Sequence, residues 1–325
     1  MMNNTPLLKV ENLNKSFPVS NGFFSSSSIA LKAVNDVSFT LEKGETLGLV
    51  GESGCGKSTI ARLLLCLDQP DSGTVAFKGK NIFEMNKADK NDFRKKVQIV
   101  FQDPFSSLNP RKKVGSIIGE PLIIHKLMPR KKIRGRVNEL MELVGLRKEY
   151  ADRYPHEFSS GQRQRIGIAR ALSLQPDIIV ADEPVSALDV SIQAQTINLF
   201  LDLQKQMGLT YLFISHDLSV VKYISSRVAV MYLGKIVEVA GRDELYTHPL
   251  HPYTRALLSA VPVPDPSKTK ERILLKGDIP SPLDPPVGCV FSSRCPEVKE
   301  EICLKKHPEL KEKKDGHFVS CFLRE

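Results

Sequence analysis

The chain has 325 residues, of which 41% are hydrophobic and 26% are charged, and its formal net charge is +9 at pH 7. This length and apolar content allow one sizeable core together with a second, smaller lobe or an extended tail. No stretch approaches the ~18 to 20 uninterrupted apolar residues that span a bilayer, which excludes a channel formed by this chain alone.

The first residues and the distribution of charge bear on location and partners. Met1 to Thr5 lack the charged and apolar blocks of a secretory signal, so we expect a cytoplasmic protein. The basic residues are scattered, and their densest group, Arg130 to Arg136, is interpreted as the solvated start of a helix. We therefore predict that the protein binds no nucleic acid.

A glycine-rich loop follows two predicted strands. Residues 37–41 alternate like a half-exposed strand, and residues 45–50 indicate a more buried one. Residues 51–59 match the pattern G-x-x-x-x-G-K-S/T, and the residues that follow, as far as Leu65, favour a helix. A strand, a glycine loop and a helix in this order are typical of a phosphate-binding site.

Each residue type in this loop has a chemical reason. Glycines let the backbone point successive N–H groups at phosphate oxygens, Lys57 supplies a mobile cation, and the Ser58 hydroxyl can coordinate Mg²⁺. The alternative, a glycine-rich turn without a ligand, is disfavoured by the strand and helix on either side. The candidate nucleotide-binding residues of the loop are Gly51, Ser53, Gly54, Cys55, Gly56, Lys57, Ser58 and Thr59.

Strand and helix patterns alternate over residues 36–232, which indicates a mostly parallel sheet covered by helices. Helical patterns alone predominate between residues 103 and 160 and predict a helical subdomain. Further core strands are expected at 178–181, 212–215 and 228–232, with a long helix over 191–207. From about residue 249 proline recurs, so we expect no continuous sheet there.

Two adjacent carboxylates end the strand at 178–181. Asp182 at a strand end can hold a magnesium ion, and Glu183 beside it can polarise the water that attacks the γ-phosphorus. Alone, this sequence would be an ordinary polar turn. Together with the loop upstream, it predicts that Glu183 is a catalytic base.

These motifs resemble those of the ABC transporter ATPases. Residues 154–165, with Ser159, Gly161 and Gln162, look like the signature segment that separates this family from other P-loop proteins. The resemblance implies that these residues face the γ-phosphate of ATP bound to a partner subunit, at the N-terminus of a helix expected from Arg163 to Ser173. Ser160 stands where the family usually has a second glycine, and its side chain could restrict close approach to the phosphate.

The resemblance also assigns roles to four residues outside these motifs. Gln102 is similar to the residue that touches Mg²⁺ and the attacking water, and His216 to the switch histidine on the γ-phosphate. Asp189 matches the loop that contacts the opposite subunit, and it would also cap the helix that begins near Ser191. Phe17 aligns with the aromatic residue that stacks on adenine, although a strand-end Phe is equally often a core residue.

Three stretches are similar to the ATPase subunits of dipeptide and oligopeptide importers, namely residues 101–111, 181–191 and 251–258. The segment from Pro280 to Cys321 resembles the C-terminal extension of that group, which can hold a four-iron, four-sulfur cluster. Its four cysteines are Cys289, Cys295, Cys303 and Cys321. Thiolates suit such a cluster, which we favour, but the spacing also suits zinc, and buried structural thiols are a third alternative.

The sequence therefore predicts an α/β fold: a P-loop NTPase core of the ABC ATPase type with a helical subdomain, an antiparallel β portion and a small cysteine-containing C-terminal extension. We expect the ATPase domain at 7–248, with the helical subdomain at about 103–160, and the extension at 249–325.

The implied function is ATP hydrolysis, with ATP and Mg²⁺, that powers import of dipeptides or oligopeptides. The implied partners are a second, non-identical ATPase subunit, two transmembrane permease subunits and, indirectly, an external peptide-binding protein, at the cytoplasmic face of the inner membrane. Alternatives are import of nickel or another small solute, a soluble ABC ATPase that acts on nucleic acid, and a P-loop kinase. Soluble ABC ATPases usually carry two cassettes or a long coiled coil, whereas this sequence has one cassette and no heptad run, which disfavours that alternative. A P-loop kinase would not need the signature segment.

Overall fold

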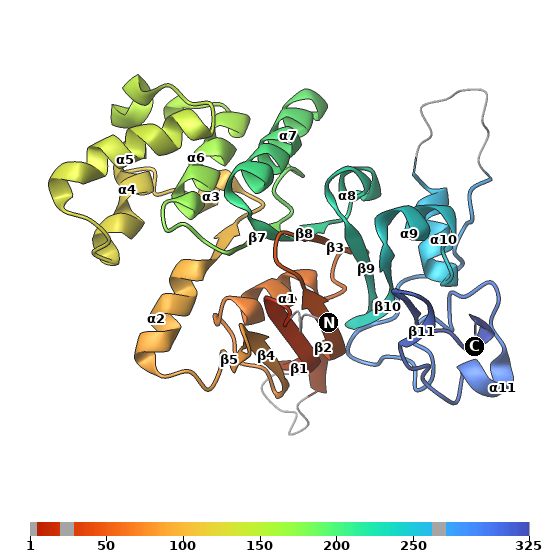
Figure 1. Cartoon of the computed structure of the whole chain (residues 1–325). Helices are drawn as coiled ribbons and strands as arrows, with labels where there is room; N and C mark the ends of the chain where they lie inside the picture. Colours follow the sequence, from red (N-terminus) through yellow and green to blue (C-terminus); the bar gives the residue numbers. More distant parts are fainter. Residues whose placement is uncertain (1–4, 20–28, 262–270, 325) are drawn as a thin grey trace. The chain divides into compact units, whose positions relative to one another are not determined.

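The computed structural model describes residues 5–19, 29–261 and 271–324. These residues form two compact units. Unit 1 consists of Met1–Leu41, Thr46–Phe83 and Ser215–Glu325, and unit 2 consists of Glu42–Glu45 and Glu84–Ile214. Both units combine strands with helices, so the predicted α/β class is confirmed (Figure 1).

Unit 1 contains a four-stranded antiparallel sheet. Its order is β2-β1-β4-β5, with the strands β1 (Leu8–Val19), β2 (Ile29–Leu41), β4 (Ser72–Phe77) and β5 (Lys80–Asn81). Leu8 and Val10 are buried whereas Lys9 and Glu11 are exposed. This period of two gives β1 one face toward the core and one toward solvent.

A second set of strands in unit 1 carries the phosphate loop. The order is β11-β12-β10-β9-β3, with β3 (Thr46–Val50), β9 (Arg227–Tyr232), β10 (Lys235–Gly241), β11 (Lys311–Lys314) and β12 (His317–Val319). β3 and β9 are parallel, and the other pairs are antiparallel. All five residues of β3 are buried, as expected for an inner strand without alternation. The helices of unit 1 are α1 (Lys57–Leu64), α8 (Leu218–Ile224), α9 (Arg242–Thr247), α10 (Pro252–Ser259) and α11 (Glu300–Cys303).

The hairpin β11–β12 differs from the expectation that sheet would not continue beyond residue 249. It lies after Pro308, where the proline-rich segment has ended, and β12 pairs with β10 through Glu238 and Val239. Proline blocks sheet pairing because it lacks an N–H group, so strands can form again once it is absent.

Unit 2 contains three parallel strands in the order β8-β7-β6, namely β6 (Val97–Val100), β7 (Ile178–Asp182) and β8 (Thr210–Ser215). The long helix α7 (Val190–Met207) buries Ile197, Phe200 and Leu203, a spacing that places them on one helical face. The ring of Phe200 packs edge-on against Tyr211 at 5.4 Å between centroids.

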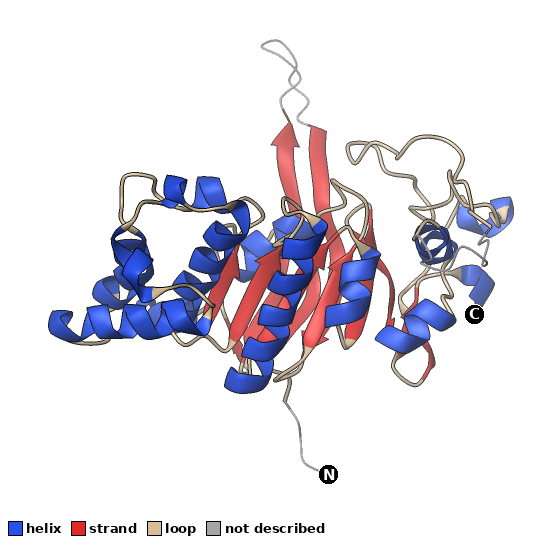
Figure 2. Cartoon of the chain, turned by 90° about the horizontal axis from the view of Figure 1, so that it is seen from above, coloured by secondary structure: helices blue, strands red, loops and turns tan. Residues whose placement is uncertain are grey.

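The stretch between β6 and β7, residues 101–177, is described throughout and holds helices and loops without a strand (Figure 2). In α5 (Arg130–Leu143), the residues Val137, Leu140 and Met141 are buried at helical spacing, and this helix packs against α4 (Val114–Ile124). The helices of unit 2 are α2 (Lys87–Lys96), α3 (Pro104–Ser107), α4 (Val114–Ile124), α5 (Arg130–Leu143), α6 (Ser160–Leu172) and α7, with the short turns η1 (Lys148–Asp152) and η2 (Pro155–Glu157). The predicted bounds of the domains and of the helical subdomain stay predictions.

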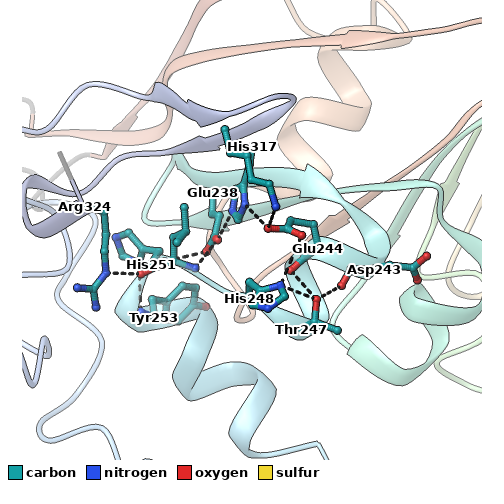
Figure 3. Close-up of polar contacts among 11 residues, drawn as sticks. Glu238, Asp243, Glu244, Thr247, His248, His251, Tyr253, His317 and Arg324 are labelled. Atoms are coloured by element: carbon teal, nitrogen blue, oxygen red, sulfur yellow. Dashed lines mark hydrogen bonds and ion pairs between the residues drawn. The ribbon is translucent and has the colours of Figure 1, made fainter.

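A buried polar network fastens the end of the chain to β10 (Figure 3). Glu238 is fully buried, and its carboxylate accepts hydrogen bonds from the backbone N–H groups of Leu250 at 2.7 Å and His251 at 3.0 Å. Nε2 of the buried His317 in β12 lies 2.8 Å from the same carboxylate. Because His251 and His317 are buried, these two donors have a hydrogen-bond partner only while Glu238 accepts from them.

We expect Glu238→Ala to lower the free energy of unfolding by about 3 kcal/mol, since it leaves buried donors without an acceptor. Chemical denaturation followed by circular dichroism measures this change. Glu309→Ala is the matched control, because this glutamate of the same segment is exposed and should change stability by less than about 0.5 kcal/mol. Equal stability of the two variants would contradict the role of the network.

His251 gives this network a dependence on pH. Burial lowers the pKa of His251 to about 4, and its Nδ1 accepts the N–H of Tyr253 at 3.1 Å, which requires an unprotonated nitrogen. In the unfolded chain the imidazole regains its ordinary pKa of 6.5. Between these values only the unfolded state takes up the proton, so stability is lost as the pH falls from about 6.5 to about 4.

Each pKa unit corresponds to about 1.4 kcal/mol, so the loss due to His251 is about 3 kcal/mol. We expect His251→Asn, which keeps an acceptor for the helix N-terminus, to flatten the stability profile over this pH range. Unfolding midpoints at several pH values test this, with the exposed His248→Asn as the control that keeps the slope. An unchanged slope in His251→Asn would contradict the assignment.

Candidate functional site

The phosphate loop connects β3 to α1 in unit 1 and follows a path that only glycine permits at two positions. Gly51 has φ +156° and Gly56 has φ +107°. A Cβ at Gly51 would lie 2.2 Å from the carbonyl oxygen of Met231, and one at Gly56 would lie 2.1 Å from that of Ala33. The glycines are therefore required for close approach of the loop to β9 and β2, as well as for its curvature.

The Lys57 side chain folds back and binds backbone carbonyl groups of the loop. Its buried Nζ donates to the carbonyl oxygen of Gly51 at 2.8 Å and to that of Glu52 at 3.0 Å. The thiol of Cys55 lies 3.7 Å from the same Nζ, and burial raises the pKa of that thiol although Lys57 opposes the shift. Lys57 thus holds a positive charge at the centre of the loop.

The remaining predicted residues of unit 1 belong to the loop, to the start of α1 and to two other segments of the chain. Ser53, Gly54 and Ser58 are exposed, and Thr59 is half-buried. His216 is exposed directly after β8, next to Asp217, whose side chain caps α8. Phe17 lies in β1, opposite Leu31 of β2, and Lys15 Nζ lies 5.4 Å from the centre of its ring.

In unit 2 the structure brings Gln102 and Glu183 together. Gln102 Nε2 donates to Glu183 Oε2 at 2.9 Å, across 81 residues of sequence. Glu183 has φ +47°, a left-handed conformation that is uncommon for a residue other than glycine, and its N–H donates to the carbonyl oxygen of Ile214 in β8. Asp182, the last residue of β7, is half-buried.

The signature segment forms the start of α6, which begins at Ser160 and not at Arg163 as predicted. Ser159 is the N-cap: its Oγ accepts from the N–H of Gln162 at 3.3 Å, and Oε1 of Gln162 accepts from the N–H of Ser159 at 3.1 Å. This capping box extends the helix toward the signature, because it satisfies N–H groups at the helix end. Ser160 is exposed in the first turn.

Gly161 of the signature helix packs against α7, and Asp189 caps the N-terminus of α7. A Cβ at Gly161 would lie 2.3 Å from the side chain of Ile192, so glycine is required by packing at this position. The side chain of Asp189 accepts from the N–H of Ile192 at 3.1 Å, which confirms the predicted N-cap of α7. The exposed Asp189 has its pKa lowered chiefly by this hydrogen bond.

Two residues that the sequence did not indicate contact the phosphate loop. The Tyr253 hydroxyl accepts the N–H of Glu52 at 3.0 Å, and the Arg294 guanidinium makes two hydrogen bonds to the Glu52 carboxylate at 2.8 and 3.2 Å. They lie 201 and 242 residues from Glu52 in sequence, so no motif spacing could have linked them.

The four C-terminal cysteines are free thiols in unit 1. Burial, with a smaller contribution from the other thiols of the group, raises the pKa of Cys289 and of Cys295 to about 11. The thiols are thus within electrostatic range of one another. Among the described residues, however, no three His, Cys, Asp or Glu side chains are placed as ligands of one metal ion, so the predicted iron-sulfur cluster finds no support in this arrangement.

No helix in the described part of the chain is both long and apolar enough to cross a membrane.

Known families match two parts of the chain. The profile of the ABC transporter family matches residues 34–186, and that of the oligopeptide/dipeptide transporter C-terminal region matches residues 237–303. The solved structure of MJ0796, described as a dimeric post-hydrolysis state of an ATP-binding cassette bound to ADP and Pi, has a TM-score of 0.64 and 27% identity, and the match covers 72% of this chain and 98% of that one.

Two similar proteins match almost the whole chain. The oligopeptide transport ATP-binding protein AppF of Bacillus subtilis is 56% identical, over 99% of this chain and 98% of its own length. The dipeptide transport ATP-binding protein DppF of Haemophilus influenzae is 53% identical, over 98% and 97%. The resemblance found in the sequence is confirmed: this chain is an ATPase of the ABC transporter family and belongs to its group of oligopeptide and dipeptide transport ATP-binding proteins.

Proposed function

We propose that this ATPase powers the import of dipeptides or oligopeptides through a membrane permease. The observation that carries the proposal is the presence, in one chain, of the ATPase profile and the C-terminal profile of peptide transporters. The similar proteins named for oligopeptide and dipeptide transport extend this likeness over nearly the full length.

In the proposed cycle the phosphate loop binds the triphosphate of ATP. Backbone N–H groups of the loop and of the first turn of α1 donate to the phosphate oxygens, and Lys57 exchanges its contacts with Gly51 and Glu52 for the β- and γ-phosphates. Phe17 is the proposed stacking partner of adenine, and His216 the proposed partner of the γ-phosphate.

The residues proposed for magnesium fit that ion by their chemistry. Ser58, Gln102 and Asp182 offer hydroxyl, amide and carboxylate oxygens, the hard ligands that Mg²⁺ prefers. When bound, the ion would neutralise charge on the phosphates.

Glu183 is the proposed catalytic base. Its carboxylate accepts a hydrogen bond from the Gln102 amide at 2.9 Å, which helps to orient the group that would take the proton of the attacking water. The left-handed backbone at Glu183 supports the proposal, because such strain is often retained at functional sites.

The proposed working form is a pair of ATPase subunits, in which the signature residues Ser159, Gly161 and Gln162 of each subunit complete the ATP site on the loop of the other. The N-terminal end of α6 supports this role, since it presents backbone N–H groups and a positive dipole. Asp189 would contact the opposite subunit. We propose that the second subunit is a non-identical homologue.

Two permease subunits are the proposed membrane partners, with an external peptide-binding protein delivering the substrate. The candidate contact is the stretch from Phe105 to Pro110, where Phe105 is 55% exposed. Aromatic side chains are enriched in protein–protein interfaces, so the exposed ring of Phe105 suits such a contact. The protein would then work at the cytoplasmic face of the inner membrane as a peripheral subunit.

We expect Glu183→Gln to lower the ATPase rate by at least about 100-fold, because an amide cannot accept the proton of the attacking water. ATP should still bind, since the substitution keeps the size of the side chain. Steady-state hydrolysis and equilibrium ATP binding measure the two effects. Glu139→Gln, an exposed glutamate of α5, is the control that keeps the wild-type rate. Wild-type turnover in Glu183→Gln would rule out this base.

Transport tests the function as a whole. The complex is purified with its membrane subunits and placed in vesicles that contain ATP, with the peptide-binding protein added outside. It should take up a dipeptide or oligopeptide, and Glu183→Gln should abolish uptake. Uptake of nickel alone would support the small-solute alternative instead.

Recovery of nucleic acid without a membrane partner would contradict the transporter proposal. Iron and zinc analysis of the same sample tests whether the four C-terminal cysteines bind a metal.

A further inference from the structure

Glu52, the second residue of the phosphate loop, is held at each of its polar groups. Its N–H donates to the Tyr253 hydroxyl at 3.0 Å, its carbonyl oxygen accepts from Lys57 Nζ at 3.0 Å, and its carboxylate accepts two hydrogen bonds from Arg294. Two of these three partners belong to the C-terminal part of the chain, beyond the match to the ABC transporter profile at 34–186. The phosphate loop is therefore held by residues that the general ATPase motifs do not include.

The C-terminal partners come from a rigid support. Arg294 ends a turn in which its N–H donates to the carbonyl oxygen of Phe291 at 3.1 Å. The buried ring of Phe291 packs against Tyr253 and Tyr232, with centroids 5.4 and 5.3 Å apart. Because aromatic packing fixes this turn, the Arg294 guanidinium reaches Glu52 from a set position, and its side chain is only 9% exposed.

Charge gives this contact a consequence for nucleotide binding. A carboxylate in the phosphate loop, near Lys57, would repel the triphosphate if it had no partner. Arg294 pairs with both carboxylate oxygens, and a bidentate pair of this kind cancels the negative charge and fixes the direction of the side chain. The Glu52 side chain is 26% exposed, so its interaction with a bound anion is only partly screened by solvent.

We propose that Arg294 is a positioning residue for ATP binding: through Glu52 it neutralises and holds the phosphate loop, so that the C-terminal segment sets the affinity of the ATPase for ATP. This inference rests on the proposed binding of ATP by the loop. It adds to that proposal a determinant of affinity outside the ATPase motifs.

The test compares Arg294→Gln, Glu52→Gln and the double variant in the full-length chain. Arg294→Gln leaves the Glu52 carboxylate unpaired, so the Kd and KM for MgATP should rise about fivefold while kcat stays within about twofold. In the double variant the unpaired charge is gone, and the Kd should return to within about twofold of the wild type. The defect of Arg294→Gln should shrink as salt is added, because salt screens charge.

Arg255→Gln is the matched control. Arg255 pairs with Glu297 at 2.6 Å in the same C-terminal segment, and the described contacts of that pair do not include the phosphate loop. It should bind MgATP like the wild type. Equal weakening in Arg255→Gln and Arg294→Gln would overturn the inference, because the effect would then come from general loosening of the segment.

A second variant covers the case in which Arg294→Gln does not fold. Arg294→Lys keeps the charge but not the bidentate pair, so its Kd for MgATP should lie between the values of the wild type and of Arg294→Gln. If this variant binds ATP about fivefold more weakly, neutralisation of Glu52 is not the cause. Wild-type affinity in Arg294→Gln, or a double variant no better than the single one, would likewise overturn the inference. Absence of ATP binding by the wild-type chain would instead overturn the proposed function itself.

Discussion

The close approach of the phosphate loop to the neighbouring backbone is the constraint on which the rest of unit 1 depends. Gly51 passes the Met231 carbonyl, and Gly56 passes the Ala33 carbonyl, at distances that leave no room for a Cβ. The loop can therefore take this path only if β9 and β2 are already in place on either side of it. The path of the phosphate loop therefore requires both the absence of a Cβ at these two glycines and the correct pairing of strands that are distant in sequence.

Features that are determined by residues close together in the sequence could be predicted, whereas features that depend on residues far apart in the sequence could not. The strand, loop and helix around Gly51 to Thr59 and the cap at Asp189 follow from neighbouring residues, and both were predicted. The sequence predicts the start of α6 three residues too late, because the reciprocal bonds of Ser159 and Gln162 extend the helix into the signature segment. The β11–β12 hairpin was missed because the prolines before it dominated the local pattern.

Contacts between residues far apart in the sequence could not be predicted from local patterns. The motif identified Glu183 and a resemblance identified Gln102, but their hydrogen bond follows only from the fold of unit 2. The two partners of Glu52 lie in stretches that resemble peptide importer subunits, but nothing in the sequence of those stretches relates Tyr253 or Arg294 to the phosphate loop. Burial of a charge pair becomes visible only when the surrounding packing is known.

The C-terminal segment is held to the rest of unit 1 by polar contacts as well as by apolar packing. Aromatic packing around Phe291 sets the position of the turn that carries Arg294, and Glu238 and Glu52 accept hydrogen bonds in fixed geometries. Glu238 is fully buried and the Glu52 side chain is 26% exposed, so each carboxylate loses contact with water at a cost in free energy that its partners must offset. This cost favours the arrangement of the segment that keeps those partners in place. Because one of these carboxylates belongs to the phosphate loop, the geometry of that loop depends on correct folding of a segment more than 200 residues away.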